Sequence, residues 1–484
     1  MSKALSTLIK PRPLVIGLML ALSQQAYAQA DEIRSTLADQ QSVAVTIYNG
    51  DLALVKDQRK VTLKSGLNAL ALRDVSAQIR AETALLRSLN GSLQTLEQNF
   101  DFDLLSPDKL LEKYIGQQVQ VIRTNPATGA ETTEQATVLA ANNGTVLKIG
   151  NRIETGVPGR IVYPDVPDNL RDRPTLVTQI NSKQSGSQDI ELSYLTGGLG
   201  WKADYVAELN ATEDKLDLSG WVTLSNTSGT SYRNAKLQLV AGDVNRVLPP
   251  HPAPVAMMRK NEMMMADAAP MAEESLLEYH LYSLERPTTI AENQTKQVAL
   301  LNAQAVPVRK ELVLRGDSYY YQASQGELGQ KLKVGVFVEF DNKEASRLGI
   351  PLPKGIMRVY KKDSQGNAQF VGEDKIDHTA KNESVRLKLG EAFDVTADKK
   401  QTDFKKLPNP AKGNSQFESA YEIVLKNAKS QAVTVNVLEP IPGDWKLLSQ
   451  SHPSKKASSN TASWSITIPA ESSVTLNYRA QVKY

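Results

Sequence analysis

Hydrophobic and polar residues alternate with a period of two along most of the chain, which is typical of strands with one buried face. Residues 43–55 contain two such strands on either side of a turn at 49–51, where Asn-Gly-Asp favours positive φ. Residues 60–72 repeat the arrangement around a turn at 64–66. Both segments predict β-hairpins, and the pattern as a whole predicts an all-β fold.

One short helix is expected to interrupt the strands. Ser106 can cap it, Pro107 suits its first turn, and the apolar stripe that follows ends at Gly116. Residues 119–163 then contain short strands separated by turn residues at regular spacing. They predict a small barrel-like part of an N-terminal β domain.

Longer strands begin near residue 190 and are interrupted twice. Residues 249–274 are rich in Pro, Met and Ala, and residues 401–416 are rich in Lys, Pro and Asn. Neither stretch reads as a strand, so both predict loops. Alternation returns over residues 464–484 and predicts the last strands of an immunoglobulin-like unit.

The predicted organisation has four parts. These are a signal peptide (1–28), an N-terminal β domain (29–189), a central β-sandwich domain with a Met-rich loop at 249–274 (190–400), and a C-terminal immunoglobulin-like unit (401–484).

A weak internal echo joins the last two parts. Val222-x-Leu224-x-Asn226 recurs as Ile423-x-Leu425-x-Asn427, and each is followed by a polar turn and another strand. Two sandwich-like units would produce this echo. A shared hairpin type without any duplication would produce it equally well.

The N-terminus has the features of a secretory signal peptide. A basic start precedes an apolar run at 14–22 and the sequence Ala26-Tyr27-Ala28, which predicts cleavage between Ala28 and Gln29. The apolar run is too short for a membrane-spanning helix, which needs about 20 residues. We therefore expect a periplasmic or secreted protein without a transmembrane segment in the mature chain. The absence of cysteine excludes disulfides and thiol chemistry.

Charge gives no reason to expect a nucleic acid as partner. The chain has 484 residues, and three of its 56 basic residues, Lys3, Lys10 and Arg12, lie in the leader. The remaining 53 basic residues equal the 53 acidic residues. A nucleic-acid-binding protein would need an excess of Lys and Arg on one face.

Several short motifs together resemble a bacterial secreted family of unknown function, whose domain also forms the C-terminal part of mucoidy inhibitor A proteins. The resemblance covers residues 40–484 and is most specific over 190–484. It implies export and an all-β fold, and it offers no catalytic residues. No heptad run corresponds to the coiled coil of the mucoidy inhibitor type, so that functional label does not carry over. The motifs are Gly200-Trp201-Lys202-Ala203-Asp204-Tyr205, Gly220-Trp221, Ala241-Gly242-Asp243, Leu352-Pro353-x-Gly355, Gly390-x-x-Phe393-Asp394, and Tyr421 with Asn427 and Trp445.

Methionine is concentrated in the predicted loop, which raises the question of metal binding. Thioether sulfur is a soft ligand that favours Cu(I), but methionine is also adaptable apolar filler at a partner contact. The residues concerned are Met257, Met258, Met263, Met264, Met265 and Met271, flanked by His251 and His280.

The other candidate residues have simpler explanations. Asp377-His378 reads as a turn or strand edge, and the string Ser106-x-x-Lys109 is better explained by helix capping than by acyl-enzyme chemistry. The histidines match no zinc motif, and the Asp residues lack the other ligands of a calcium loop, so we expect solvated turns. The tryptophans are expected in sheet packing. These last residues are His251, His280, His378 and His452; Asp101, Asp103 and Asp108; and Trp201, Trp221, Trp445 and Trp464.

The predicted function is that of an exported, non-enzymatic β protein that binds an envelope protein or polymer through sheet edges and the 250–275 loop. Two alternatives stay open. An envelope hydrolase would assemble its site from distant strands, and the Met-rich loop would handle copper. No catalytic, cofactor-binding or metal-binding residue is assigned.

Overall fold

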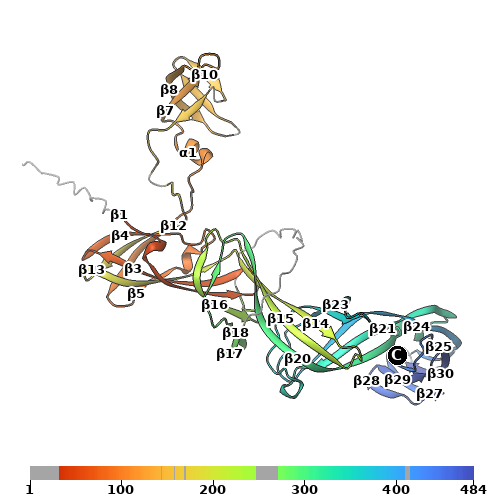
Figure 1. Ribbon diagram of the computed structural model, residues 1–484. Coiled ribbons are helices and arrows are strands. Elements are labelled where there is room, and N and C mark those ends of the chain that lie inside the picture. Colours follow the sequence, from red (N-terminus) through yellow and green to blue (C-terminus); the bar gives the residue numbers. More distant parts are fainter. Residues whose placement is uncertain (1–31, 143, 157–158, 168–169, 247–270, 409–414) are drawn as a thin grey trace, which may run out of the picture.

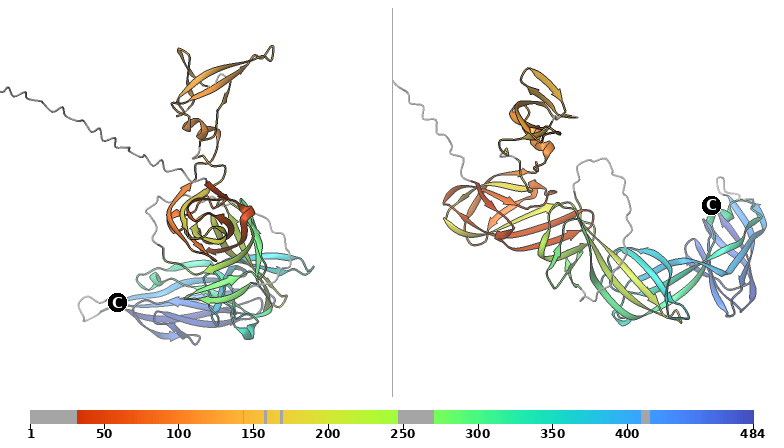
Figure 2. Two further views of the ribbon diagram at one scale, coloured as in Figure 1. Left: turned by 90° about the vertical axis from the view of Figure 1, so that its left-hand side faces the viewer. Right: turned by 45° about the horizontal axis from the view of Figure 1, so that its top comes forward.

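The computed structural model describes residues 32–142, 144–156, 159–167, 170–246, 271–408 and 415–484. Strands dominate throughout these ranges, and the one α-helix among them is α1 (Pro107–Lys113). Short 3-10 turns occur at Leu37–Asp39, Ala81–Thr83, Ser318–Tyr321 and Glu344–Ser346. The prediction of an all-β fold is confirmed. Figures 1 and 2 show an elongated row of β units, with one small unit projecting from its N-terminal part.

An eight-stranded sheet and a four-stranded sheet form the N-terminal layers. The first has the order β17-β18-β16-β2-β3-β13-β5, with β19 on β16, and the second has the order β1-β4-β12-β6. Their bounds are β17 (Ala272–Leu276), β18 (Tyr279–Ser283), β16 (Tyr232–Ala241), β2 (Gln40–Tyr48), β3 (Leu52–Leu63), β13 (Gly186–Thr196), β5 (Leu85–Ser88), β19 (Thr288–Ile290), β1 (Glu32–Ser35), β4 (Gly66–Arg73), β12 (Thr175–Ser182) and β6 (Leu93–Asp101).

The first predicted hairpin is confirmed, whereas the second is wrong. Strands β2 and β3 pair across a turn in which Gly50 and Asp51 have φ of 77° and 55°. Strands β3 and β4 do not pair with each other, because β3 joins β13 and β4 joins β12 in the other sheet. The chain crosses between layers here, and the buried Asn68 side chain holds the crossing through Lys64 and Gly66.

The projecting unit is an insertion between β6 and β12. Its sheet has the order β10-β9-β8-β7-β11 and is open, not closed into a barrel. The predicted helix is confirmed, since Ser106 Oγ accepts a hydrogen bond from Lys109 N. The unit has a core of its own, centred on Tyr114, Val121 and Leu147. Its strands are β7 (Gln118–Thr124), β8 (Glu131–Ala140), β9 (Val146–Ile149), β10 (Arg152–Thr155) and β11 (Arg160–Val162).

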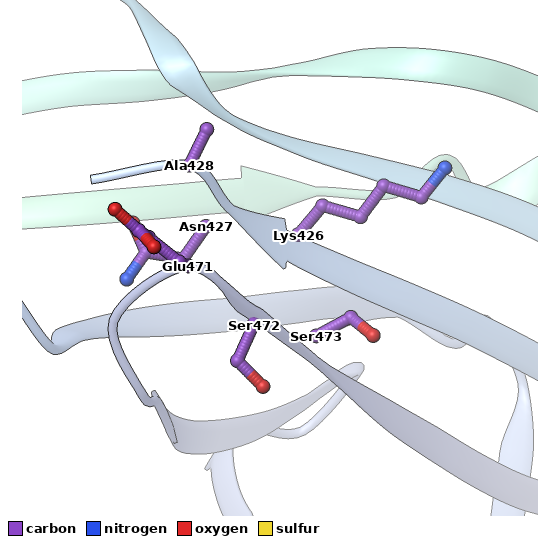
Figure 3. A pocket seen from close by; sticks show the side chains of 6 residues that line it. All are labelled: Lys426, Asn427, Ala428, Glu471, Ser472 and Ser473. Atoms are coloured by element: carbon purple, nitrogen blue, oxygen red, sulfur yellow. The ribbon is translucent and has the colours of Figure 1, made fainter. Parts of the chain in front are cut away.

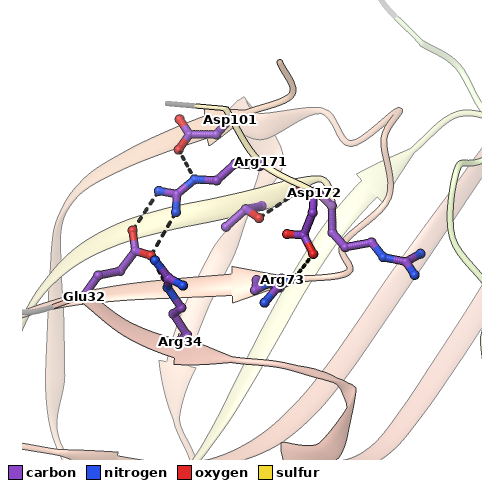
Figure 4. Close-up of polar contacts among 8 residues, drawn as sticks. Glu32, Arg34, Arg73, Asp101, Arg171 and Asp172 are labelled. Atoms are coloured by element: carbon purple, nitrogen blue, oxygen red, sulfur yellow. Dashed lines mark hydrogen bonds and ion pairs between the residues drawn. The ribbon is translucent and has the colours of Figure 1, made fainter. Parts of the chain in front are cut away.

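Arg171 fixes the neck of this insertion unit. Its guanidinium lies 2.7 Å from Glu32 Oε2 and 3.0 Å from Asp101 Oδ2, so it ties the outgoing and returning segments to β1 (Figure 4). Arg171 N also donates to the Asp103 carbonyl at 3.0 Å. The contacts with Arg171 lower the pKa of Glu32, the hydrogen bond being the largest cause, and partial burial opposes this shift. The two ends of the insertion are therefore held side by side.

A fourth, long sheet runs through the remaining chain. Its order is β23-β22-β14-β15-β20-β21-β24-β25-β30-β27, while β26 pairs with β20 and β29, and β28 pairs with β29. The strands are β23 (Ala368–Ile376), β22 (Gly355–Lys362), β14 (Leu199–Leu209), β15 (Lys215–Asn226), β20 (Gln294–Arg315), β21 (Glu327–Asp341), β24 (Ser384–Leu407), β25 (Gln416–Asn427), β30 (Ser472–Lys483), β27 (Asp444–Gln450), β26 (Val433–Pro440), β29 (Thr461–Ile468) and β28 (Lys455–Ser458).

Strand β20 links two sandwiches because it changes partners along its length. Residues 294–307 pair with β15, whereas residues 308–315 pair with β21 and β26. We call the unit built on β14, β15 and β16 the first sandwich and the unit built on β24, β25 and β26 the second sandwich. Their buried residues fall into separate hydrophobic clusters.

The two sandwiches share one pairing scheme. In the first, β15 pairs with β14 and β20, β16 pairs with β19, and β16 runs parallel to β2. In the second, β25 pairs with β24 and β30, β26 pairs with β29, and β26 runs parallel to β20. The sequence echo therefore marks two units of the same topology.

A buried asparagine ends the long strand of the first sandwich. Asn226 Nδ2 donates to the carbonyl oxygens of Thr230 (2.9 Å) and Ile290 (3.1 Å). Its Oδ1 accepts from Ser228 N at 3.0 Å. One side chain thus shapes the turn between β15 and β16 and ties it to β19.

The second sandwich repeats this arrangement at Asn427. Its Nδ2 donates to the carbonyl oxygens of Gln431 (2.8 Å) and Ile468 (3.3 Å). Its Oδ1 accepts from Lys429 N at 3.0 Å. The matching asparagine contacts extend the equivalence of the sandwiches from topology to individual hydrogen bonds.

Both predicted loops contain strand residues. Residues 272–274 belong to β17, and residues 401–407 belong to β24, which pairs with β25. Lys399 and Gln401 of β24 face the core. The rest of the Met-rich segment, residues 247–270, and residues 409–414 lie outside the described residues. The expected domain borders at 189/190 and 400/401 fall inside β13 and β24, and this division remains a prediction.

Replacing Asn427 by alanine should lower the free energy of unfolding of the second sandwich by about 2–4 kcal/mol, because it leaves several buried polar groups unpaired. Urea unfolding followed by tryptophan fluorescence measures the loss. Asn477→Ala, at an exposed position of β30, is the matched control and should change stability by less than about 0.5 kcal/mol. Equal effects of the two substitutions would contradict the role of the buried amide.

Candidate functional site

The second sandwich encloses a pair of opposite charges between its sheets. Lys399 of β24 and Glu439 of β26 meet with Nζ and Oε2 2.6 Å apart, and their side chains are 2% and 0% exposed. Lys399 takes an inward position of its strand, between the buried Ala397 and Gln401. The pair therefore links the two layers of the sandwich.

Two tyrosine hydroxyls complete the surroundings of the carboxylate. Tyr321, in the 3-10 turn before β21, and Tyr478 of β30 each donate to Glu439 Oε2 at 3.1 Å. The two hydroxyl oxygens lie 2.8 Å apart. Glu439 Oε2 thus gathers an ammonium group and two hydroxyls from three different elements, whereas Oε1 has no partner among the described residues.

The network continues on the lysine side. The Lys399 ammonium lies 4.2 Å from the centre of the Tyr320 ring, a distance suited to a cation–π contact. Tyr421 and Gln401 donate to the Tyr320 carbonyl at 2.7 and 3.1 Å. These contacts hold the 3-10 turn against the interior of the sandwich.

Burial sets the electrostatics of this cluster. Desolvation lowers the pKa of Lys399, and Glu439 opposes that shift. Desolvation also raises the pKa of Tyr321 and Tyr478 well above 10, with the nearby Glu439 adding to it. The pKa of Tyr421 rises to about 12, again mainly because of burial. All three tyrosines therefore stay protonated near neutral pH and can donate hydrogen bonds.

This cluster has a structural role. A side chain at Gly316 would meet Glu439 Oε2 at 2.4 Å, so the backbone packs directly onto the carboxylate. A substrate could reach the charged atoms only by opening the sandwich. The arrangement therefore fixes the relative position of β24, β26, β30 and the 3-10 turn, and offers no accessible general acid or base.

The accessible feature nearest to the sequence echo is a shallow recess beside Asn427. It has a volume of about 430 Å³ and lies between the turn after β25 and the start of β30 (Figure 3). Asn427 turns its amide inward, whereas most of the other lining residues are exposed. The lining is Lys426, Asn427, Ala428, Glu471, Ser472 and Ser473.

The described histidines have separate local partners. His280 Nδ1 lies 2.8 Å from Glu273 Oε1, and His452 Nδ1 lies 2.9 Å from Ser451 Oγ. His378 Nδ1 accepts from Lys354 N at 3.3 Å, and its pKa is lowered by burial first and by the Lys354 charge second. In the described ranges, no group of three His, Cys, Asp or Glu residues is placed to hold a metal ion.

The remaining sequence candidates have structural roles or lie outside the described residues. Asp101 pairs with Arg171, and Asp103 pairs with Lys113 at 2.8 Å. Among the six loop methionines, Met271 is buried in the first hydrophobic cluster. Trp201 and Trp464 are buried and Trp221 and Trp445 half-buried, as expected for sheet packing. His251, Met257, Met258, Met263, Met264 and Met265 fall outside the described residues.

Comparison with known families identifies the larger part of the chain. Residues 190–484 match the domain of unknown function DUF4139. The chain belongs to this family. The DUF4139 region contains most of the first sandwich and all of the second, and its first residue lies inside β13. A comparison with curated proteins finds no match.

The part of the chain that the structure describes contains no helix long and apolar enough to cross a membrane.

Sequence reasoning missed the charged cluster. Lys399 and Glu439 lie on strands that are distant in the chain, and Lys399 stands beside Lys400 in a segment of high polarity. One signal was available, because Val395, Ala397 and Lys399 share a period of two, which places the lysine on the buried face.

Glu439→Gln should lower the free energy of unfolding by about 3–5 kcal/mol, because it leaves the Lys399 charge buried without a partner. The double variant Lys399→Met/Glu439→Gln removes both charges and should recover much of this loss. Glu422→Gln, which breaks the more exposed pair between Glu422 of β25 and Lys400 of β24, is the matched control and should cost less than about 1 kcal/mol. A double variant no more stable than Glu439→Gln would contradict this account.

The buried tyrosines should make the protein sensitive to alkaline pH. Their pKa values are raised in the folded state, so their contribution to stability is complete below pH 10 and falls as pH rises above it. Absorbance titration of phenolate should show Tyr321 and Tyr478 ionising only together with unfolding. Tyr321→Phe and Tyr478→Phe should each remove one late-titrating group. Reversible ionisation of every tyrosine near pH 10 in the folded protein would refute this expectation.

Proposed function

We propose that this protein is an exported, non-enzymatic binding or scaffolding protein of the bacterial cell envelope, periplasmic or secreted after cleavage between Ala28 and Gln29. Its resemblance to the C-terminal domain of mucoidy inhibitor A proteins implies export and therefore supports this location. The proposed partner is an envelope protein or an envelope polymer, and no nucleic acid is involved.

The edge strands of the insertion unit are the main support for this proposal. It stands on two chain segments, and within the described residues β10 and β11 each pair on one side only. Edge strands of this kind present unpaired backbone groups to which another chain can add. Ile153 of β10 is 65% exposed and supplies an apolar contact on that edge.

A second edge supports the same function. Strand β17 ends the eight-stranded sheet among the described strands, and Leu277 beside it is 86% exposed. This edge directly follows the Met-rich segment. We propose that partners bind through these edges and through the 250–275 segment.

Hydrolysis of envelope material and copper handling remain the alternative functions. The charged cluster gives the hydrolase no accessible site. Burial of Met271 removes one of the six loop methionines from a surface copper site. Deletion of residues 255–270, which keeps Met271 and β17, should leave copper tolerance unchanged if the segment serves binding.

Excision of the insertion unit tests the proposal. Asp103 and Arg171 are adjacent, so a Gly-Gly link can replace residues 104–169 and keep the Arg171 ion pairs. We expect the remaining body to keep its unfolding midpoint. We also expect chemical crosslinking of the mature protein in the envelope of its own host to lose a reproducible partner.

Ile153→Lys is the matched variant that keeps the insertion unit but places a charge on its β10 edge. It should weaken the same crosslink without affecting stability, because Ile153 is exposed. A reproducible partner lost in both variants supports the proposal. No partner with any form of the protein would contradict it and would direct attention to turnover of envelope polymers.

A further inference from the structure

The corresponding ends of the two sandwiches differ: another part of the chain covers the first, whereas among the described residues no equivalent segment covers the second. The equivalence of the ends extends to the backbone beside each buried asparagine. Thr227 N donates to the Gly198 carbonyl at 2.7 Å, and Ala428 N donates to the Asp394 carbonyl at 2.8 Å. The turn beside the buried asparagine is therefore covered in the first sandwich, whereas no described residues cover the equivalent turn in the second.

Residues 74–78 cover the end of the first sandwich with a short turn, in which Asp74 has a φ of 64° and Ile79 N donates to the Ser76 carbonyl at 3.2 Å. Ala77 N donates to the Ser228 carbonyl at 2.8 Å, and Ser76 Oγ donates to the same oxygen at 2.9 Å. Gln78 Nε2 donates to the Thr227 carbonyl at 2.7 Å. Val75 and Ser76 are fully buried in this contact. The end of the first sandwich thus accepts hydrogen bonds from a short turn-forming segment, most of whose residues are small or polar.

The end of the second sandwich offers equivalent groups in the recess of Figure 3. The carbonyl of Ala428, the counterpart of Thr227, accepts no hydrogen bond from a described residue. The carbonyl of Lys429, the counterpart of Ser228, accepts one from Glu471 N at 3.0 Å and has a second lone pair. The Ala428 carbonyl is therefore available beside the recess, and the Lys429 carbonyl, next along the chain, keeps one acceptor position.

An exposed aromatic residue adjoins this end. Phe393 is 88% exposed and directly precedes Asp394, whose carbonyl holds Ala428. Its counterpart in the first sandwich is Gly197, where a Cβ would meet the Gln78 side chain at 2.9 Å. A large, exposed apolar side chain thus replaces the glycine that lies against the covering segment in the first sandwich.

We propose that the recess of the second sandwich binds a short, turn-forming polypeptide segment of another protein, in the way that residues 74–78 bind the first sandwich. This inference rests on the proposed binding function and assigns it a second site and a partner class. The segment donates amide and carboxamide hydrogen bonds to Ala428 and Lys429 and packs an apolar side chain on Phe393. A second copy of the chain does not supply residues 74–78, because they are buried in their own first sandwich.

The probe is the octapeptide of residues 73–80, Arg-Asp-Val-Ser-Ala-Gln-Ile-Arg, acetylated, amidated and fluorescently labelled. It is chosen because it contains the segment that covers the equivalent turn of the first sandwich. Fluorescence anisotropy with the full mature protein should show saturable binding. The same peptide with proline at the position of Ala77 lacks the donating N–H and should bind at least about tenfold more weakly.

Two variants of the protein assign the binding to the recess. Ala428→Trp fills it, and Phe393→Ser removes the exposed ring; both positions are exposed, so both variants should keep the thermal midpoint. Each should weaken binding of the octapeptide at least about tenfold. Absence of saturable binding at millimolar peptide, or unchanged binding in both variants, would overturn the proposal.

The result of the peptide-binding experiment is distinguishable from the result of the envelope crosslinking experiment. An envelope crosslink that depends on the insertion unit, with no peptide binding at the recess, would refute only this inference. Self-association that is lost in Ala428→Trp, measured by light scattering, would identify a second copy as the occupant and would also refute it.

Discussion

The architecture depends on a buried side-chain amide at the end of a long strand. Asn226 and Asn427 each bind the turn that carries the chain from one sheet of a sandwich to the other, and each also binds the strand that closes that end. A backbone that changes layers leaves carbonyl and amide groups buried and unpaired, and the amide satisfies several of them at once. Without this contact, β16 and β26 would lose their fixed positions beside β2 and β20.

The second sandwich adds a polar centre to this frame. Lys399 and Glu439 are each costly to bury alone, but the ion pair and the hydroxyls of Tyr321 and Tyr478 give Glu439 Oε2 three partners. The network connects β24, β26 and β30 with the 3-10 turn. The recess and Phe393 lie outside this network, at the surface of the second sandwich. Structural chemistry is thus confined to the interior, and the features available for binding lie on edges and ends.

The sequence predicted the local elements far better than their partners. Period-two alternation identified most strands, Asn-Gly-Asp identified the turn after β2, and Ser106 identified the start of α1. Alternation does not state which strand pairs with which, so the crossing between β3 and β4 was mistaken for a hairpin. The sequence predicts a loop at residues 401–416, because Lys, Pro and Asn are frequent there, whereas residues 401–407 continue β24 and pair with β25.

The recess beside Asn427 was predictable only in part, because it too depends on which strands pair. The echo of Asn226 in Asn427 was visible, but whether it meant duplication depended on pairings that are distant in the sequence. The difference between the two ends is a tertiary property, because it arises from residues 74–78 packing more than 140 residues away from Asn226.

Hydrogen exchange measured by mass spectrometry on the mature protein tests the central claim directly, since it compares the two ends in one molecule. The account predicts that the segment 226–232 exchanges at least about tenfold more slowly than its counterpart 427–433, because only the first turn is covered by another segment of the described chain. Equal protection of the two segments, or slower exchange at 427–433, would contradict it.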